Sequence, residues 1–244
     1  MYSYLYDIFL QEGQHDRTLA ELESRLAHLH LQGAITRLSV LKAMYMEMWL
    51  KDEFRRGVKT FIAVGNDHTL HRLMCLTQGY PVTLGIIPIG KENTMVRVLG
   101  VPSGEEACHT LSRRFIHTIP LARVNDKYFL THCSMPLPKG STLQCDTAWR
   151  LQNAAKGVLS CSHVGPTMPG CITARVTSKA WFQKEEQSQF FAHSVSFQNI
   201  REVPVRYDGE ELHASTIRIE ATPFTARVIV GASFVMPHTA GPLP

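Results

Sequence analysis

The first half of the chain alternates between short apolar runs and stretches in which apolar residues recur every three or four positions. The runs have the length of buried strands, and the second spacing is typical of amphipathic helices. Strands are expected at residues 2–10, 34–38, 61–64 and 82–87, and helices around 19–29, 41–56, 70–76, 94–99 and 104–114. Strands joined through helices pack as parallel neighbours, so the pattern predicts an α/β domain with a parallel sheet over residues 1–118.

The pattern changes near residue 118, where short alternating stretches begin to follow one another with glycine and proline between them. Period-two runs of this kind indicate antiparallel strands in a sandwich or a barrel. Strands are expected at residues 115–121, 127–133, 143–149, 157–162, 171–177, 190–197, 215–220 and 226–230. We predict an antiparallel β-sandwich domain over residues 119–234, followed by a disordered tail at 235–244.

Two polar loops follow two successive strands of the first domain. The run at 61–64 ends at Gly-Asn-Asp-His-Thr, residues 65–69, and the run at 82–87 ends at Pro-Ile-Gly-Lys-Glu-Asn, residues 88–93. The carboxyl ends of parallel strands meet at one edge of a sheet, where open α/β sheets bind their ligands. We therefore expect the two loops to lie side by side at a ligand-binding edge.

The two loops together resemble those of the diacylglycerol kinase family of lipid kinases, in which they usually read Gly-Gly-Asp-Gly-Thr and Ile-Pro-Leu-Gly-Thr-Gly-Asn-Asp. The matching residues are Gly65, Asp67, Thr69, Pro88, Gly90 and Asn93. A third match is the sequence Asp-Gly-Glu at residues 208–210, which the family places in a turn before its last strands. The resemblance implies the fold predicted above, with the nucleotide bound by the α/β domain.

The resemblance also implies roles for individual residues. ATP would be the phosphate donor, with Mg²⁺ held by Asp67, and Asp208 and Glu210 would activate the lipid hydroxyl. The nucleotide would contact both loops, through Gly65, Asn66, Asp67, Thr69, Gly90, Lys91 and Asn93. Each of these residues could instead have a purely structural role. Asp67 and Asn93 could serve as helix caps alone, and Asp-Gly is a common hairpin turn.

The loops also depart from the family. Asn66 and His68 stand where the first loop has glycines, and Lys91, Glu92 and Thr94 replace Thr, Gly and Asp in the second. Asparagine tolerates left-handed backbone, so Asn66 can keep the path of the loop, and Lys91 adds a cation that could replace lost N–H contacts to phosphate. The two loops therefore keep Asp67 but change the glycine cradle, the set of loop glycines that lets backbone N–H groups approach phosphate.

The charge and the cysteine content limit the kinds of binding partner and the cellular compartment that the protein would have. The 244 residues carry a formal charge of +4, which suits an anionic substrate or a membrane surface but forms no basic stripe for nucleic acid. The six cysteines form no Cys-x-x-Cys pair, which indicates reduced thiols in a cytoplasmic protein. His68, His71 and Cys75 have helical spacing, but no carboxylate or fourth ligand completes a metal site. No signal peptide or membrane-spanning run is expected, so any membrane contact would be peripheral.

These observations predict a divergent ATP-dependent kinase that phosphorylates the hydroxyl of a lipid. A non-catalytic ligand-binding member of the same fold is the first alternative. A relative of NAD kinase is the second, because residues 65–70 also resemble that family, although the second loop fits it less well. The acceptor, a homo-oligomeric state and the role of residues 134–190 are left open by the sequence.

Overall fold

The structure, a computed structural model, describes residues 1–11, 13, 15–37, 45–91, 93–147, 149–152, 156–162, 170–178 and 186–234. The chain divides into two compact units. The described residues of unit 1 are those of Met1–Ile119 and Ala226–Phe234, and those of unit 2 lie in Pro120–Thr225. Glu92, the start of the helix expected at 41–56 and the tail at 235–244 lie outside the described residues.

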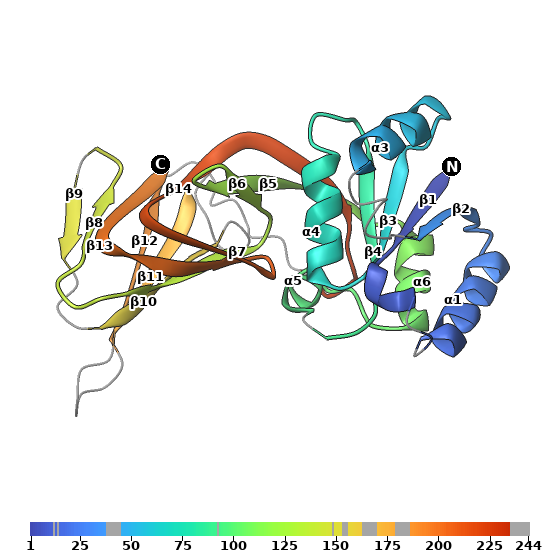
Figure 1. Cartoon of the computed structure of the whole chain (residues 1–244), viewed down its shortest axis with the longest axis horizontal. Helices are drawn as coiled ribbons and strands as arrows, with labels where there is room; N and C mark the ends of the chain where they lie inside the picture. Colours follow the sequence, from blue (N-terminus) through green and yellow to red (C-terminus); the bar gives the residue numbers. More distant parts are fainter. Residues whose placement is uncertain are drawn as a thin grey trace, which may run out of the picture. The chain divides into compact units, whose positions relative to one another are not determined.

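Unit 1 is built on a parallel sheet with the strand order β2-β1-β3-β4-β14 (Figure 1). Its strands are β1 (Tyr2–Tyr6), β2 (Gly33–Arg37), β3 (Thr60–Gly65), β4 (Thr83–Pro88) and the end of β14 (Glu210–Ile229). Every residue of β3 and β4 is buried. Central strands of a parallel sheet are covered on both faces, which explains the unbroken apolar runs at 61–64 and 82–87.

Helices connect the parallel strands, as the spacing of apolar residues predicts. They are α1 (Asp16–His28), α3 (Met46–Arg55), α4 (Asp67–Leu76), α5 (Thr94–Val98) and α6 (Glu105–Arg113), with a 3-10 turn η1 (Ile8–Gln11) after β1. Helix α4 packs on β3 and β4 and contacts α3, while α6 packs on β4 and contacts α1. Leu19, Leu22 and Leu26 of α1 recur at helical spacing and are buried, so they form the core-facing side of this helix.

Unit 2 is antiparallel, with the strand order β12-β11-β10-β7-β13-β14 and the pairs β5-β6 and β8-β9 attached to β14 and β13. Its strands are β5 (Ile116–Val124), β6 (Lys127–Phe129), β7 (His132–Leu137), β8 (Thr142–Cys145), β9 (Trp149–Gln152), β10 (Gly157–Ser162), β11 (Ile172–Ser178), β12 (Glu186–Ala192), β13 (Ser194–Tyr207) and β14. The predicted fold class, a parallel α/β unit followed by an antiparallel β unit, is confirmed.

Three strands expected from alternation are each two strands in the structure. The stretch 127–133 is divided between β6 and β7, 143–149 between β8 and β9, and 190–197 between β12 and β13. Asp146, between β8 and β9, has a φ of 51°, a left-handed backbone that turns the chain. Strand alternation continues through such tight turns, so the pattern alone did not reveal them.

The second domain was expected to extend to residue 234, but unit 2 ends at Thr225 among the described residues. Residues 226–234 belong to unit 1, because the end of β14 adds a parallel strand beside β4, with Arg227 opposite Thr83. The Gly231 N–H then donates to the Leu99 carbonyl at 2.9 Å. A Cβ on Gly231 would overlap the Gly100 carbonyl. The chain after β14 can therefore approach the end of α5 this closely only because residue 231 is glycine.

Candidate functional site

The two polar loops lie side by side at the carboxyl ends of β3 and β4. The strands pair in parallel, with Gly65 opposite Pro88, and the Ile89 N–H donates to the Gly65 carbonyl at 2.8 Å. The predicted adjacency of the loops is therefore confirmed. It follows from the two successive strand-loop-helix units, whose loops must emerge at the same edge.

Asp67 connects the first loop to the second. It is the first residue of α4 and only 2% exposed. Its carboxylate accepts hydrogen bonds from the N–H groups of Met95 at 2.8 Å and Val96 at 3.0 Å. Both donors lie in the first turn of α5, where backbone N–H groups have no partner within the helix. Asp67 thus caps the helix of the other loop, not the one that it begins.

Asn66 and Thr69 form a capping box at the start of α4. The Asn66 Oδ1 accepts from the Thr69 N–H at 3.3 Å, and the Thr69 Oγ1 accepts from the Asn66 N–H at 3.2 Å. Asparagine is among the best N-cap residues, whereas glycine offers no side-chain acceptor. The substitution of Asn for the family glycine therefore stabilises the local helix start.

Asp7 is a member of this site that the sequence analysis missed. It follows β1 directly, is 6% exposed, and accepts a hydrogen bond from the Thr69 hydroxyl. Its N–H donates to the Val64 carbonyl at 3.0 Å, which fixes it beside the end of β3. A polar residue directly after an apolar strand was the available signal, but it was concealed because the apolar run resumes at Ile8.

The space beside Gly65 is filled by the chain itself. A Cβ on this residue would overlap the Thr69 Oγ1 and lie 3.0 Å from the Cβ of Asp7. Glycine is therefore required here by the packing of Thr69 and Asp7.

The second loop is more open. Gly90 is exposed and has a φ of 85°, a left-handed conformation that favours glycine, and Lys91 beside it is exposed. Asn93 stands at the N-cap position of α5 but makes no side-chain cap, because Asp67 binds the first N–H groups of this helix. The Asn93 Nδ2 donates to the Gly90 carbonyl at 3.0 Å, and its Oδ1 is buried with no partner among the described residues.

Asp208 and Gly209 form the two-residue turn of the β13–β14 hairpin, with φ values of 43° and 86°. The turn alternative is therefore confirmed for these two residues. Asp208 is fully buried, and its carboxylate accepts from the N–H groups of Leu130, Thr131 at 3.0 Å and His132 at 3.2 Å. It also accepts from the Thr131 hydroxyl at 2.5 Å. These bonds take the backbone donors that would otherwise continue one strand through 127–133.

Glu210, by contrast, is partly exposed at the start of β14. The catalytic roles expected for Asp208 and Glu210, and their approach to Asp67, stay predictions.

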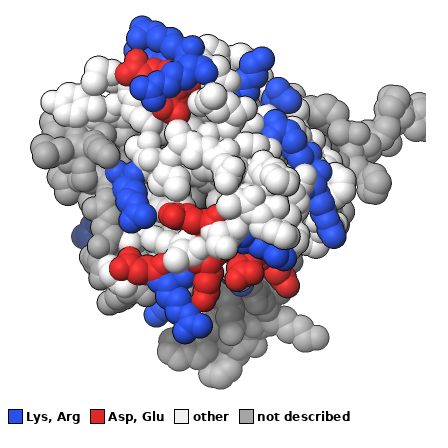
Figure 2. Space-filling view, turned by 90° about the vertical axis from the view of Figure 1, so that its right-hand side faces the viewer, with Lys and Arg blue, Asp and Glu red and all other residues white. Residues whose placement is uncertain are grey.

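No metal centre is built by the described residues alone, since no three of their His, Cys, Asp and Glu side chains are grouped to hold an ion. His71 and Cys75 lie 3.6 Å apart between Nε2 and Sγ as a pair. Figure 2 shows cationic and acidic side chains interspersed over the face of the molecule that it displays. None of the helices formed by the described residues is both long and apolar enough to cross a bilayer.

Comparisons with known proteins agree with this arrangement. Residues 11–124 match the sequence model of the diacylglycerol kinase catalytic domain. A search of curated proteins by sequence finds no match. The fold resembles a diacylglycerol kinase from Bacillus anthracis strain Sterne, with a TM-score of 0.69 and 18% identity over 96% of this chain and 98% of that one. A second structure from that strain, described as a candidate diacylglycerol kinase, has a TM-score of 0.70 and 17% identity over 95% and 97% of the two chains.

The fold and the paired loops define an α/β protein whose parallel sheet ends in two adjacent polar loops. The match to the diacylglycerol kinase catalytic domain covers just under half of the chain, and the resemblance to the solved structures is one of fold.

Proposed function

We propose that the protein is a divergent ATP-dependent kinase that transfers phosphate to the hydroxyl of a lipid. The observation that carries the proposal is the junction of the two family loops at one sheet edge, bridged by the Asp67 carboxylate. The family match supports the reaction class. The lipid acceptor rests on that family likeness.

The nucleotide would be held mainly by the second loop. Lys91 is exposed there and supplies a cation for phosphate oxygens. The Asn93 Oδ1 is a buried acceptor without a described partner, and burying such an atom costs free energy unless a donor reaches it. A nucleotide hydroxyl or amino group would provide that donor. Gly90 leaves the approach free of a side chain.

Mg²⁺ is best treated as part of the substrate, as ATP–Mg²⁺. The described residues do not form a resident metal site, and each Asp67 oxygen already accepts a backbone N–H. Mg²⁺ keeps several waters and is commonly held by one or two carboxylates together with substrate phosphates. Asp67 would then contact the ion through a bound water or a remaining lone pair.

In the transfer step, the lipid hydroxyl oxygen bonds to the γ-phosphorus as the bond between that phosphorus and the ADP oxygen breaks. The hydroxyl proton passes to a general base. We assign this role to Glu210, which is partly exposed, in preference to Asp208, which is fully buried and accepts four hydrogen bonds. Asp208 would act indirectly, by fixing the turn that carries Glu210.

A non-catalytic ligand-binding member of the fold is the second candidate. It is favoured by one specific observation, which is that the side chain of Asn66, one of the two residues that replace glycines, takes the backbone N–H of Thr69. A loop closed in this way offers less backbone to a phosphate than an open glycine cradle. The NAD kinase-like alternative rests on the first loop alone.

Calorimetry with ATP–Mg²⁺ and a radiolabelled phosphorylation assay with diacylglycerol in mixed micelles would test the proposal. The native protein should bind ATP–Mg²⁺ and label the lipid. Glu210→Gln should abolish labelling while nucleotide binding persists. Asp52→Asn, which removes an exposed acid of α3, serves as the matched control and should behave as the native protein does.

The double variant Asn66→Gly with His68→Gly separates the two candidates. If the altered cradle limits a true kinase, restoring the glycines should tighten nucleotide binding and raise the rate. Losing one preorganised donor to a transition-state charge typically costs about 2 to 4 kcal/mol. If neither the native nor the restored protein binds nucleotide, the kinase proposal gives way to the non-catalytic one.

A further inference from the structure

Four neighbouring strands of unit 2 carry a row of polar side chains on one face. The pairing register places Arg150 of β9 opposite Gln144 of β8, Gln144 opposite Ser196 of β13, and Ser196 opposite Arg218 of β14. Residues directly opposite each other share a face of the sheet. The alternate residues Leu143 and Ile217 are fully buried in the core of the unit, so the polar row lies on the outer face.

This outer face is hollowed into a pocket of about 880 Å³. Its floor includes Gln144, Ser196 and Thr216, and its rims are the loop 138–141 and the bulged segment of β13 around 198–200. The volume lies within the range of about 300 to 1,000 Å³ that is usual for small-molecule sites. All of the lining residues belong to unit 2.

The pocket is positively charged. Among the lining residues that the structure describes, the charged ones are Lys139 and Arg150, and none is acidic. Both cations are exposed, and the Arg150 Nε donates to the Gln144 Oε1 at 2.8 Å. That bond orients the guanidinium and leaves its terminal N–H groups as a fork, the geometry that matches phosphate oxygens.

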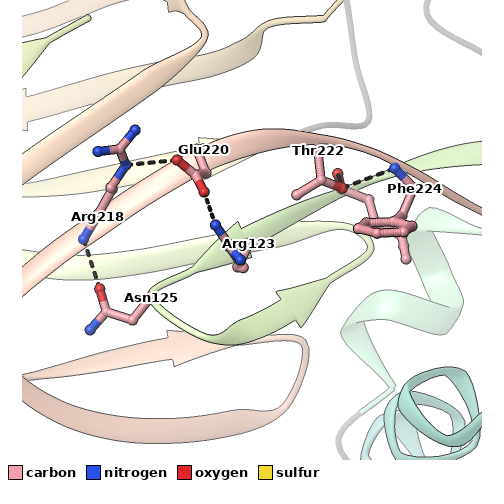
Figure 3. Close-up of polar contacts among 7 residues, drawn as sticks. Arg123, Asn125, Arg218, Glu220, Thr222 and Phe224 are labelled. Carbon is pink, nitrogen blue, oxygen red and sulfur yellow. Dashed lines mark hydrogen bonds and ion pairs between the residues drawn. The ribbon is translucent and has the colours of Figure 1, made fainter. Parts of the chain in front are cut away.

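The nearest acid on this face of β14 is already bound by two arginines. Glu220 accepts hydrogen bonds from Arg123 and, at 2.6 Å, from Arg218 (Figure 3). Two guanidinium groups against one carboxylate leave an excess of positive charge. This cluster therefore adds to the field of the pocket, since Thr216, two residues before Arg218, lines the pocket itself.

We propose that this pocket binds a phosphate group, carried by either a lipid head group at a bilayer surface or a free phosphate ester. Lys139 contributes charge, Arg150 contributes paired N–H donors, and the hydroxyls of Thr142 and Ser196 complete the donor set. The proposal stands on unit 2 alone and does not depend on the kinase activity. Ile200, 99% exposed on the rim, is the residue that would enter a bilayer if the source is a lipid.

The test compares two charge-matched double variants of the full chain. Lys139→Gln with Arg150→Gln removes the pocket cations. Lys127→Gln with Arg206→Gln removes two exposed cations of unit 2 that lie outside the pocket. Binding of inorganic phosphate is measured by calorimetry, and retention on phosphatidylcholine vesicles with and without phosphatidic acid is measured by sedimentation.

Native protein should bind phosphate or the acidic vesicles, and the pocket variant should bind about tenfold more weakly, while the control variant is unchanged. Loss on vesicles alone, together with a further loss in Ile200→Ser, identifies the lipid head group as the source. Loss with inorganic phosphate, and no effect of Ile200→Ser, identifies a free phosphate ester. Equal behaviour of the two double variants, or no binding by native protein in either assay, overturns the proposal.

Discussion

The hydroxyl of Thr69 occupies the space that a side chain on Gly65 would need. The two residues are thus packed as a pair, and Gly65→Ala should overpack the loop and lower the free energy of unfolding by about 1 to 3 kcal/mol. Thr69→Ala removes the hydroxyl and should relieve part of the overpacking. The double variant should therefore be more stable than the sum of the two single effects predicts. Urea unfolding of the four proteins measures the coupling.

The control for this cycle is Thr94→Ala, which removes an exposed threonine at the start of α5. Its effect should simply add to that of Gly65→Ala. If the effects of Gly65→Ala and Thr69→Ala were also additive, residues 65 and 69 would not compete for one space.

Asp67→Asn should destabilise the protein as well as impair any phosphoryl transfer. The amide has one acceptor oxygen where the carboxylate has two, and its NH₂ group would face a backbone donor. We expect a loss of about 1 to 3 kcal/mol in the free energy of unfolding. Urea unfolding measures it, with Asp52→Asn as an exposed control expected to change by less than about 0.5 kcal/mol. A stability equal to that of the native protein would mean that Asp67 does not hold α5.

Asp208→Asn and Glu210→Gln should differ in their effects on stability and on activity. Asp208→Asn breaks a buried set of hydrogen bonds and should cost about 1 to 3 kcal/mol of stability. Glu210→Gln should leave stability within about 0.5 kcal/mol of native, because the residue is partly exposed, while lipid phosphorylation is lost. Thermal unfolding and the kinase assay on both variants decide the assignment, and full activity of Glu210→Gln would remove it as the base.

The strands that the sequence predicted best are those buried on both faces. Residues 61–64 and 82–87 are unbroken apolar runs because β3 and β4 are central, and their order along the chain was enough to bring the two loops together. The sequence also singled out Asp67, whose carboxylate bridges the two loops. It did not identify the partner, since the acceptor role toward Met95 and Val96 depends on how α4 and α5 pack.

What the sequence did not predict depends on contacts between distant residues. Leu130 and Thr131 interrupt an alternating stretch because Asp208, in the turn between β13 and β14, binds their N–H groups. Nothing in the local pattern at 127–133 carries that information. Asp7 was missed for the same reason, since its role is set by Thr69 of a later helix.

The Arg123–Glu220 contact should make stability depend on pH. The hydrogen bond from Arg123 lowers the pKa of Glu220 below its usual value. A carboxylate whose pKa is lower in the folded state stabilises the fold above its unfolded pKa of about 4.3, and this stabilisation is lost as the pH falls through the folded pKa. Glu220→Gln should therefore be less stable than native by up to about 1 kcal/mol at pH 7, with the difference vanishing in acid. Urea unfolding at several pH values follows it, and a difference independent of pH would contradict the ionic origin.

The six cysteines should differ in their reaction with a thiol reagent. Cys75 is exposed and the other five are buried. Burial raises the pKa of the Cys133 and Cys161 thiols well above that of a free cysteine, so little reactive thiolate forms. Under native conditions iodoacetamide should modify Cys75 first, as read by peptide mass spectrometry, and Cys75→Ser should react slowly until denaturant is added. Rapid labelling of Cys133 or Cys161 in native protein would show that the core of unit 2 opens readily.

The return of β14 into unit 1 sets an order of assembly during synthesis. The first 119 residues leave the ribosome with the outer edge of β4 unpaired, and the strand that covers it arrives only with residues 226–229. An uncovered edge strand invites pairing with other chains. The edge of β4 therefore stays open to such pairing until the synthesis of unit 2 is complete.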